Sequence, residues 1–264
     1  MAKEGRDKLL IIDSSARNIS HFPSPNKYDV TLTDDYEDVA EITLRSASIP
    51  FSQQLINSNN QTFVLTMLAT DYTINISNGT YTNSSFPTAL KSALDGAQTG
   101  KTFTVAIDAI SGVLSISTND STDFSFTIIS SSLAHVLGVL KNTAYSSTTG
   151  SFTGPYRTSF SGVNKLFVHM EHPSGDSLRS PSLGADRAFA MIEKGASDKA
   201  TYVGYDLPFY KKIFNPPLAR FNKISLKFID IDNNLYDFQN QDHTLVISMH
   251  CVNPKKYRDW SAHK

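Results

Sequence analysis

The stretch FNKISLKFIDIDNNLYDFQNQDHTLVISMHCV, residues 221–252, decides the fold class. Apolar residues alternate with polar ones over residues 224–228 and again over residues 245–251. Because successive side chains of a strand point to opposite faces, each segment predicts a β-strand with one buried face. Residues 232–234 (DNN) favour a turn between them, since Asp and Asn tolerate left-handed backbone. We therefore predict a hairpin, which needs an opposing sheet because two strands alone cannot bury their apolar faces.

The strands of the opposing sheet are expected near the start of the chain. Residues 8–13 (KLLIID) and 28–32 predict two short strands, and residues 39–49 predict a longer one. The apolar phase of the longer strand slips between Ala40 and Ile42, which indicates a β-bulge. We expect one β-sandwich in which these early strands pair with the late ones, because Greek-key connections bring distant segments side by side.

Residues 55–140 differ from the early and late parts of the chain. The best helix candidate begins near Pro87, since proline suits a first helical turn, and it ends at Gly96. Residues 103–116 predict a hairpin of their own, so this block has the elements of a compact sub-domain. Residues 142–162 are rich in Ser, Thr and Gly, which predicts a loop or linker.

The domain organisation follows from that contrast. The chain has 264 residues, a length that suits one large β domain or two small ones. Its hydrophobic content of 40% is enough for a core, and its aromatic content of 11% suits β-sheet packing. We predict a mainly all-β protein, with a β-sandwich built from residues 1–54 and 151–264. An inserted α+β sub-domain and linker, residues 55–150, interrupts it.

Charge and cysteine content exclude several classes of protein. Lysine and arginine total 24 against 25 acidic residues, for a net charge of −1. Surfaces that follow nucleic-acid phosphates usually have a basic excess, so no specific nucleic-acid partner is predicted. Cys251 is the single cysteine, which excludes an internal disulfide and predicts a small buried side chain. The N-terminal apolar run is short, so neither a signal peptide nor a membrane span is expected.

Motifs for catalysis or metal binding are missing from the sequence. It contains no phosphate loop and no Gly-X-Ser-X-Gly nucleophile motif. His169 and His172 lie three apart, but nothing nominates further zinc ligands. Residues 230–234 begin like a calcium loop, yet Leu235 replaces its glycine and Gln241 its glutamate. The sequence therefore predicts no enzyme activity, no cofactor and no metal site. A hydrolase that assembles Ser, His and Asp from distant residues stays open as a lesser alternative.

The C-terminal tail, residues 254–264 (PKKYRDWSAHK), combines basic residues with aromatic ones. Aromatic and cationic side chains serve at interfaces, where a ring fills a pocket and a charge pairs at the rim. The candidate subunit-contact residues are Lys255, Lys256, Tyr257, Arg258 and Trp260. The simpler interpretation is a solvated C-terminus, and docking of the tail on nucleic acid is a weaker alternative.

Several short motifs resemble those of one protein family, the minor capsid proteins of large icosahedral double-stranded DNA viruses. The motifs are IIDSSARN (residues 11–18), PNKYDV (25–30), ASIP (47–50), ISNGTY (76–81), LG (137–138) and FNKI (221–224). One departure from the family pattern is the late turn, where Asn233-Asn234 stands in place of the usual glycine.

The resemblance implies a jelly roll that builds or cements a capsid shell, including the possibility of a pentameric vertex (penton-type) protein. It also implies partners and a location: the major capsid protein, copies of the chain itself in a homo-oligomer, and a virion assembled in the host cytoplasm. A near-neutral charge that permits self-association and the lack of catalytic motifs agree with such a role.

A second interpretation is a non-catalytic carbohydrate-binding module. β-Sandwiches of this size often hold sugars on exposed aromatic rings. The candidate rings are Tyr202, Tyr205, Phe209 and Tyr210.

Overall fold

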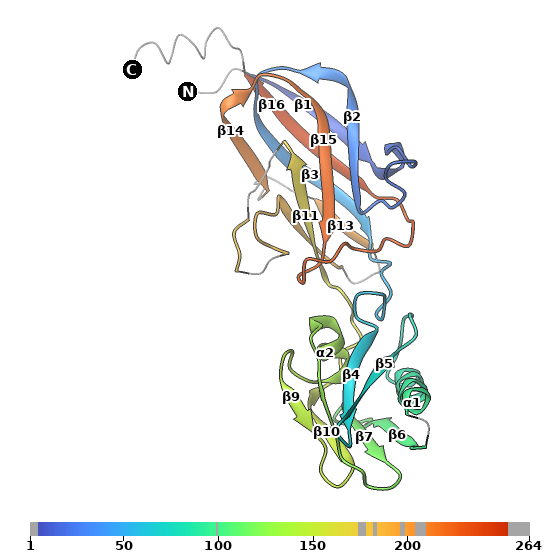
Figure 1. Cartoon of the computed structure of the whole chain (residues 1–264). Coiled ribbons are helices and arrows are strands. Elements are labelled where there is room, and N and C mark those ends of the chain that lie inside the picture. The colour runs from blue at the N-terminus through green and yellow to red at the C-terminus, as the bar shows by residue number, and fades with distance from the viewer. Residues whose placement is uncertain are drawn as a thin grey trace. The chain divides into compact units, whose positions relative to one another are not determined.

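The computed structural model describes residues 5–98, 100–173, 178–181, 184–195, 199–203 and 210–252 (Figure 1). The chain divides into two compact units. Unit 1 consists of Met1–Ser52 and Asn164–Lys264, and unit 2 of Gln53–Val163. Each unit is built mainly from antiparallel strands.

Unit 1 contains two sheets. The first has the strand order β1-β16-β3-β13, with β14 also paired to β3. Its strands are β1 (Gly5–Asp13), β3 (Val39–Pro50), β13 (Lys199–Val203), β14 (Lys211–Leu218) and β16 (Thr244–Val252). The second sheet has the order β12-β11-β15-β2. Its strands are β2 (Lys27–Tyr36), β11 (Lys165–His172), β12 (Ala190–Glu193) and β15 (Phe221–Ile229).

The strand order of unit 1 is that of a jelly roll. Along the chain, β1, β2 and β3 alternate between the sheets, β11 and β12 share the second sheet, and β13, β15 and β16 alternate again. The first and last strands are neighbours, and the strands described in both sheets pair in antiparallel fashion. This is the double Greek key of an eight-stranded jelly roll. The predicted jelly-roll β-sandwich is therefore confirmed.

The predicted hairpin between the two late strands is wrong. β15 pairs with β11 and β2, whereas β16 pairs with β1 and β3 in the other sheet. The turn at residues 232–234 does form, with Asn233 at φ 66° and Asn234 N donating to Asp230 Oδ1 over 2.9 Å. After this turn, however, Leu235 forms only an isolated bridge with Ile229 at the end of β15, and the chain then crosses to the opposite sheet.

The early strands pair with the late ones, as expected, and do so in both sheets. β1 and β3 flank β16, and β2 flanks β15. The predicted bulge is confirmed: His250 pairs with Glu41 and Cys251 with Val39, which leaves Ala40 without a partner on β16.

The core of unit 1 lies between the inner faces of its two sheets. Alternate residues of the late strands point into it, among them Ile224, Leu226 and Ile247, each at most 1% exposed. Tyr236 and Phe238 add to the same core from the crossing between β15 and β16, and their rings pack 4.8 Å apart. The crossing is therefore anchored by two buried aromatic rings.

Unit 2 has two small sheets and two helices. One sheet has the order β5-β4-β8-β9 and the other β10-β7-β6. The strands are β4 (Thr62–Met67), β5 (Thr70–Asn75), β6 (Phe103–Ile107), β7 (Val113–Thr118), β8 (Phe124–Thr127), β9 (Ala144–Ser146) and β10 (Ser151–Arg157), and the helices are α1 (Phe86–Ala97) and α2 (Ser131–Leu137). The loop predicted for residues 142–162 is wrong in part, because it contains β9 and β10.

The two helices follow from local sequence. In α1, Pro87 lies in the first turn, and Phe86, Leu90 and Leu94 bury one face at intervals of four residues. α2 ends at Gly138, which adopts the left-handed conformation at φ 66° and donates its N–H to the end of the helix. A Cβ at Gly138 would lie 2.2 Å from the carbonyl oxygen of Tyr156, so glycine is required there.

Candidate functional site

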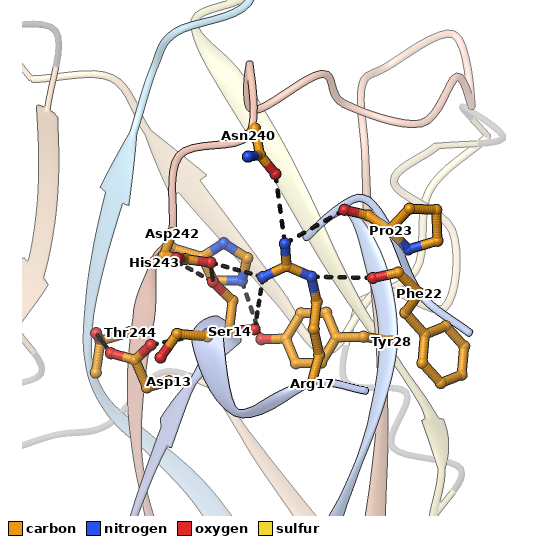
Figure 2. Close-up of polar contacts among 11 residues, drawn as sticks. Asp13, Ser14, Arg17, Phe22, Pro23, Tyr28, Asn240, Asp242, His243 and Thr244 are labelled. Carbon is orange, nitrogen blue, oxygen red and sulfur yellow. Dashed lines mark hydrogen bonds and ion pairs between the residues drawn. The ribbon is translucent and has the colours of Figure 1, made fainter. Parts of the chain in front are cut away.

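Polar side chains gather where β1 ends and β16 begins, at one end of the first sheet (Figure 2). The strand register pairs Asp13 with Thr244, and Thr244 Oγ1 donates to Asp13 Oδ2 over 2.9 Å. The chain then turns through a short 3-10 helix, Ser14–Ala16, which Asp13 caps by accepting a hydrogen bond from Ser15 N. This turn lies in the IIDSSARN motif and places Arg17 against the segment before β16.

Arg17 is the centre of this polar cluster and is only 7% exposed. Its guanidinium donates to the carbonyl oxygens of Ser14 at 2.8 Å and Phe22 at 3.0 Å. Nη1 also lies 2.7 Å from Asp242 Oδ1, and Nη2 lies 3.3 Å from the carbonyl oxygen of Pro23. Because an arginine keeps its charge when buried, it needs such partners. They fix the loop after β1 to the segment that leads into β16.

The Ser14 hydroxyl is fully buried and bonded on both sides. It donates to Asp242 Oδ1 over 2.7 Å and accepts a hydrogen bond from His243 N at 3.0 Å. The backbone N–H of Ser14 donates in turn to the carbonyl oxygen of His243 at 2.9 Å. Asp242 therefore joins Ser14 and Arg17 through a single carboxylate oxygen.

His243 connects the cluster to the aromatic core of unit 1. Its Nε2 lies 3.0 Å from the hydroxyl of Tyr28, and its ring packs 4.3 Å from Phe228 and 4.6 Å from Phe238. Burial lowers the pKa of His243 to about 3 and raises the pKa of the Tyr28 phenol, so both groups are neutral at pH 7. Two neutral groups therefore share one hydrogen bond, whose direction depends on the tautomer of the imidazole, and the second ring nitrogen is Nδ1. That nitrogen is buried and has no hydrogen-bond partner within the described part of the chain.

The cluster brings Ser, His and Asp together, as the hydrolase alternative requires, but not in a catalytic arrangement. In a catalytic triad the imidazole accepts the proton of the nucleophilic hydroxyl. Here Nε2 contacts Tyr28, while the Ser14 hydroxyl donates to Asp242. Ser14 is also 0% exposed, so no substrate reaches it. The arrangement holds chain segments together and has no geometry for nucleophilic attack.

The residues of this cluster were not predicted as a site from the sequence. Arg17 and Asp242 are 225 positions apart, and each lies in a loop of polar residues that is typical of solvated surface. The signal available in the sequence is IIDSSARN itself, where Ser14 and Ser15, both capable of hydrogen bonding, follow directly after a strand.

The predicted subunit-contact residues of the tail, Lys255, Lys256, Tyr257, Arg258 and Trp260, lie outside the described residues. The same holds for Tyr205, Phe209 and the side chain of Tyr202 among the candidate sugar-binding rings. Tyr210 is half-buried. Cys251 was predicted to be buried and is half-buried, and burial raises the pKa of its thiol.

Two of the candidate metal ligands have other partners, whereas the side chain of His172 lies outside the described residues. His169 Nε2 lies 2.9 Å from the carbonyl oxygen of Gly184. Asp230 accepts hydrogen bonds from Asn234 in a tight turn, and burial raises the pKa of its carboxyl group. Over the described ranges, no group of three or more His, Cys, Asp or Glu side chains is placed to hold a metal ion. Nor does any helix there have the length and apolar composition to cross a membrane.

Comparison with known proteins gives fold similarity and a family. The mavirus penton protein is similar with a TM-score of 0.46 and 13% identity, over 94% of this chain and 100% of that one. A chain of the Sputnik virophage structure is similar with a TM-score of 0.44 and 10% identity, over 95% of this chain and 98% of that one. No curated protein matches the sequence. Residues 4–209 match the family described as "Family of unknown function (DUF5901)", and the chain belongs to that family.

Proposed function

We propose that this chain is a structural capsid protein that builds or cements an icosahedral shell. The observation that carries the proposal is the jelly-roll strand order of unit 1, β1-β16-β3-β13 in one sheet and β12-β11-β15-β2 in the other. Jelly rolls serve as capsid, lectin and cupin domains, so the fold alone leaves a choice. The sequence resemblance to minor capsid proteins favours the first of these.

The buried polar cluster supports a scaffold role. The strongest motif of that resemblance, IIDSSARN, supplies Asp13, Ser14 and Arg17, and all three bond to the segment that starts β16. The motif therefore closes the sandwich by joining its first and last strands. A motif that closes the sandwich suits a rigid shell component, and this role requires no substrate.

The ends of unit 1 suggest how subunits are linked. Gly5 pairs with Val252, so both chain ends leave the sandwich from one place at the end of the first sheet. We propose that the tail that follows, with Lys255, Lys256, Tyr257, Arg258 and Trp260, docks on a neighbouring subunit. A rigid aromatic ring would fill a pocket there, with the cations at its rim.

The proposal also covers the partners of the protein, its position in the shell and its location. The partners are other capsid proteins, namely the major capsid protein and copies of the chain, and the position is that of a minor capsid protein or of a five-fold vertex protein. The protein is then a non-enzymatic component of the virion, assembled in the host cytoplasm.

The test is the assembly state of the full chain. Native mass spectrometry is expected to give one closed symmetric oligomer, and cryo-electron microscopy of virions is expected to place it at a fixed symmetry position. The variant Trp260→Ala should shift the oligomer toward folded monomer, whereas Ile110→Ala, at an exposed turn of unit 2, should leave it unchanged. A chain that stays monomeric at every concentration and is missing from virions would refute the proposal.

A further inference from the structure

A groove with a volume of about 770 Å³ lies in unit 2, beside strand β5 and helix α1. The strand contributes Thr73 and Asn75 to its lining, and Ser77 follows them. The helix contributes small residues in two rows spaced by four positions: Thr88, Ser92 and Gly96, and Ala89, Ala93 and Ala97. Both elements are parts of one compact unit (Figure 1).

The outer edge of β5 is unpaired. In the described part of the chain, β5 pairs with β4 alone and lies at the end of its sheet. A two-residue turn, Leu68-Ala69, connects β4 and β5, so Met67 and Thr70 form a pair that exchanges both backbone hydrogen bonds. Along the two strands, such hydrogen-bonded pairs then alternate with pairs that are not hydrogen-bonded to each other. Tyr72 and Ile74 consequently bond to β4, while the N–H and C=O groups of Thr73 and Asn75 point away from it. The hydrogen bond from Ile76 N to Gln61 O, 2.9 Å long, continues the same alternation.

These outward backbone groups belong to residues that line the groove. Each strand edge offers a row of donors and acceptors that another strand satisfies. In many proteins a helix covers the edge strand and so protects its free backbone groups. Here a groove lies between the side chains of α1 and the residues of β5. The unpaired groups of Thr73 and Asn75 are therefore open to a ligand backbone.

The walls of the groove restrict the chemistry of the ligand. None of its lining residues is charged, so an ionic ligand would find no counter-charge. The helix wall consists of Ala, Gly, Ser and Thr, which leaves room for a main chain to approach. At Gly96 an added Cβ would meet no atom within 4 Å, so the space beside that end of α1 is open.

We propose that the groove between β5 and α1 binds an extended, uncharged segment of a partner polypeptide, which adds a strand to the edge of β5. Strand addition takes its affinity from main-chain hydrogen bonds and its specificity from alternate side chains. The small Ser, Thr and Ala side chains of α1 leave room for uncharged side chains at the positions of the ligand that face the helix. This role does not depend on a capsid function.

Two substitutions separate this proposal from a merely structural role of the groove. Thr73→Pro removes an outward N–H without touching the ladder to β4, and edge strands tolerate proline at such a position. Gly96→Leu fills the open end of the groove, and leucine is a better helix former than glycine, so the fold is retained. Thr104→Leu, at an exposed position of β6 outside the groove, is the matched control.

The probe is a phage-displayed library of random peptides, selected on the full chain, with enriched sequences synthesised and measured by calorimetry. We expect uncharged peptides whose affinity falls roughly three- to tenfold in Thr73→Pro, the equivalent of one hydrogen bond. Gly96→Leu should weaken binding by at least about tenfold through steric exclusion. Thr104→Leu should leave the affinity unchanged, and thermal unfolding verifies that each variant is folded.

Several results would overturn the proposal. One is the failure of the library to yield any enriched peptide. A second is a set of peptides that binds Gly96→Leu as tightly as the parent chain. A third is an array of neutral glycans that gives binding sensitive to Gly96→Leu while peptides give none, which would assign the hydroxyl-rich lining to a sugar. Should Thr73→Pro fail to fold, Gly96→Leu decides the question alone.

Discussion

Replacement of Arg17 by methionine tests whether the buried polar cluster holds the jelly roll together. Methionine keeps much of the apolar stem of the side chain and removes its guanidinium. The variant therefore leaves the carbonyl oxygens of Ser14 and Phe22 without the donors that reach them at 2.8 and 3.0 Å. It also removes the 2.7 Å ion pair to Asp242.

The expected loss of stability depends on which hydrogen bonds each former partner of Arg17 can form again, with water or with the protein. A buried acceptor left without its donor costs about 1–3 kcal/mol. The side chain of Asp242 is 45% exposed, so water replaces part of its lost interaction and that term is small. Only part of each cost is realised, because the Ser14 oxygen keeps the backbone N–H of residue 17 at 3.2 Å and the loop can relax. We therefore expect Arg17→Met to lower the free energy of unfolding of unit 1 by about 2 kcal/mol.

The matched control is Arg220→Met. Arg220 pairs with Asp35 at 2.6 Å, a contact as short as that of Arg17, but its side chain is 66% exposed. Exposed ion pairs contribute little, so we expect no measurable loss of stability in this variant. Native-state hydrogen exchange of the amides of β1 and β16 measures both variants. A loss in Arg17→Met of less than about 1 kcal/mol, or equal to that of Arg220→Met, would refute the reasoning.

Three further predictions concern single side chains. His243 has a folded-state pKa of about 3, below its ordinary value of 6.5, so its contribution is complete above pH 6.5 and is lost as pH falls toward 3. Between pH 7 and pH 5 unit 1 should lose about 2 kcal/mol in urea unfolding, and His243→Leu should abolish most of that slope. Leu68 and Ala69 both have positive φ in the turn between β4 and β5, a conformation that Asn and Gly adopt more readily. The double variant Leu68→Asn, Ala69→Gly should therefore stabilise unit 2 by about 1–2 kcal/mol in calorimetry, and an unchanged melting temperature would contradict this. Gly138→Ala should destabilise unit 2 by more than about 2 kcal/mol, because its Cβ would lie 2.2 Å from a carbonyl oxygen, and a normal melting temperature would show that the contact relaxes.

The sequence pattern identified most strands of unit 1 but not their sheets. A period of two shows that one face of a strand is buried, and it says nothing about which strand lies beside it. For that reason β15 and β16 were expected to form a hairpin. Tyr236 and Phe238 were the residues that indicated a crossing between the sheets, because the burial of both rings requires the chain to pass over the core.

The candidate site was harder to predict than the fold. Polar residues in a loop look solvated in sequence, and Arg17 becomes a buried charge only because the segment before β16 folds over it. Their pairing depends on the closure of the whole sandwich, a non-local event without a local signature. His243 shows the same limit, since its pKa depends on the rings of Phe228 and Phe238, which arrive from other parts of the chain.

The position of the cluster bears on how the proposed tail contact would be supported. β16 has the cluster at its start and the tail after its last residue, Val252. It also pairs along its length with β1 on one side and β3 on the other, so it is an inner strand of its sheet. A force applied to the tail by a neighbouring subunit would therefore act along a strand held by two ladders and anchored at its far end by the ion pair of Arg17 and Asp242. Displacing β16 would require breaking both ladders and the cluster together, which makes this end of the sandwich a suitable place to attach a subunit.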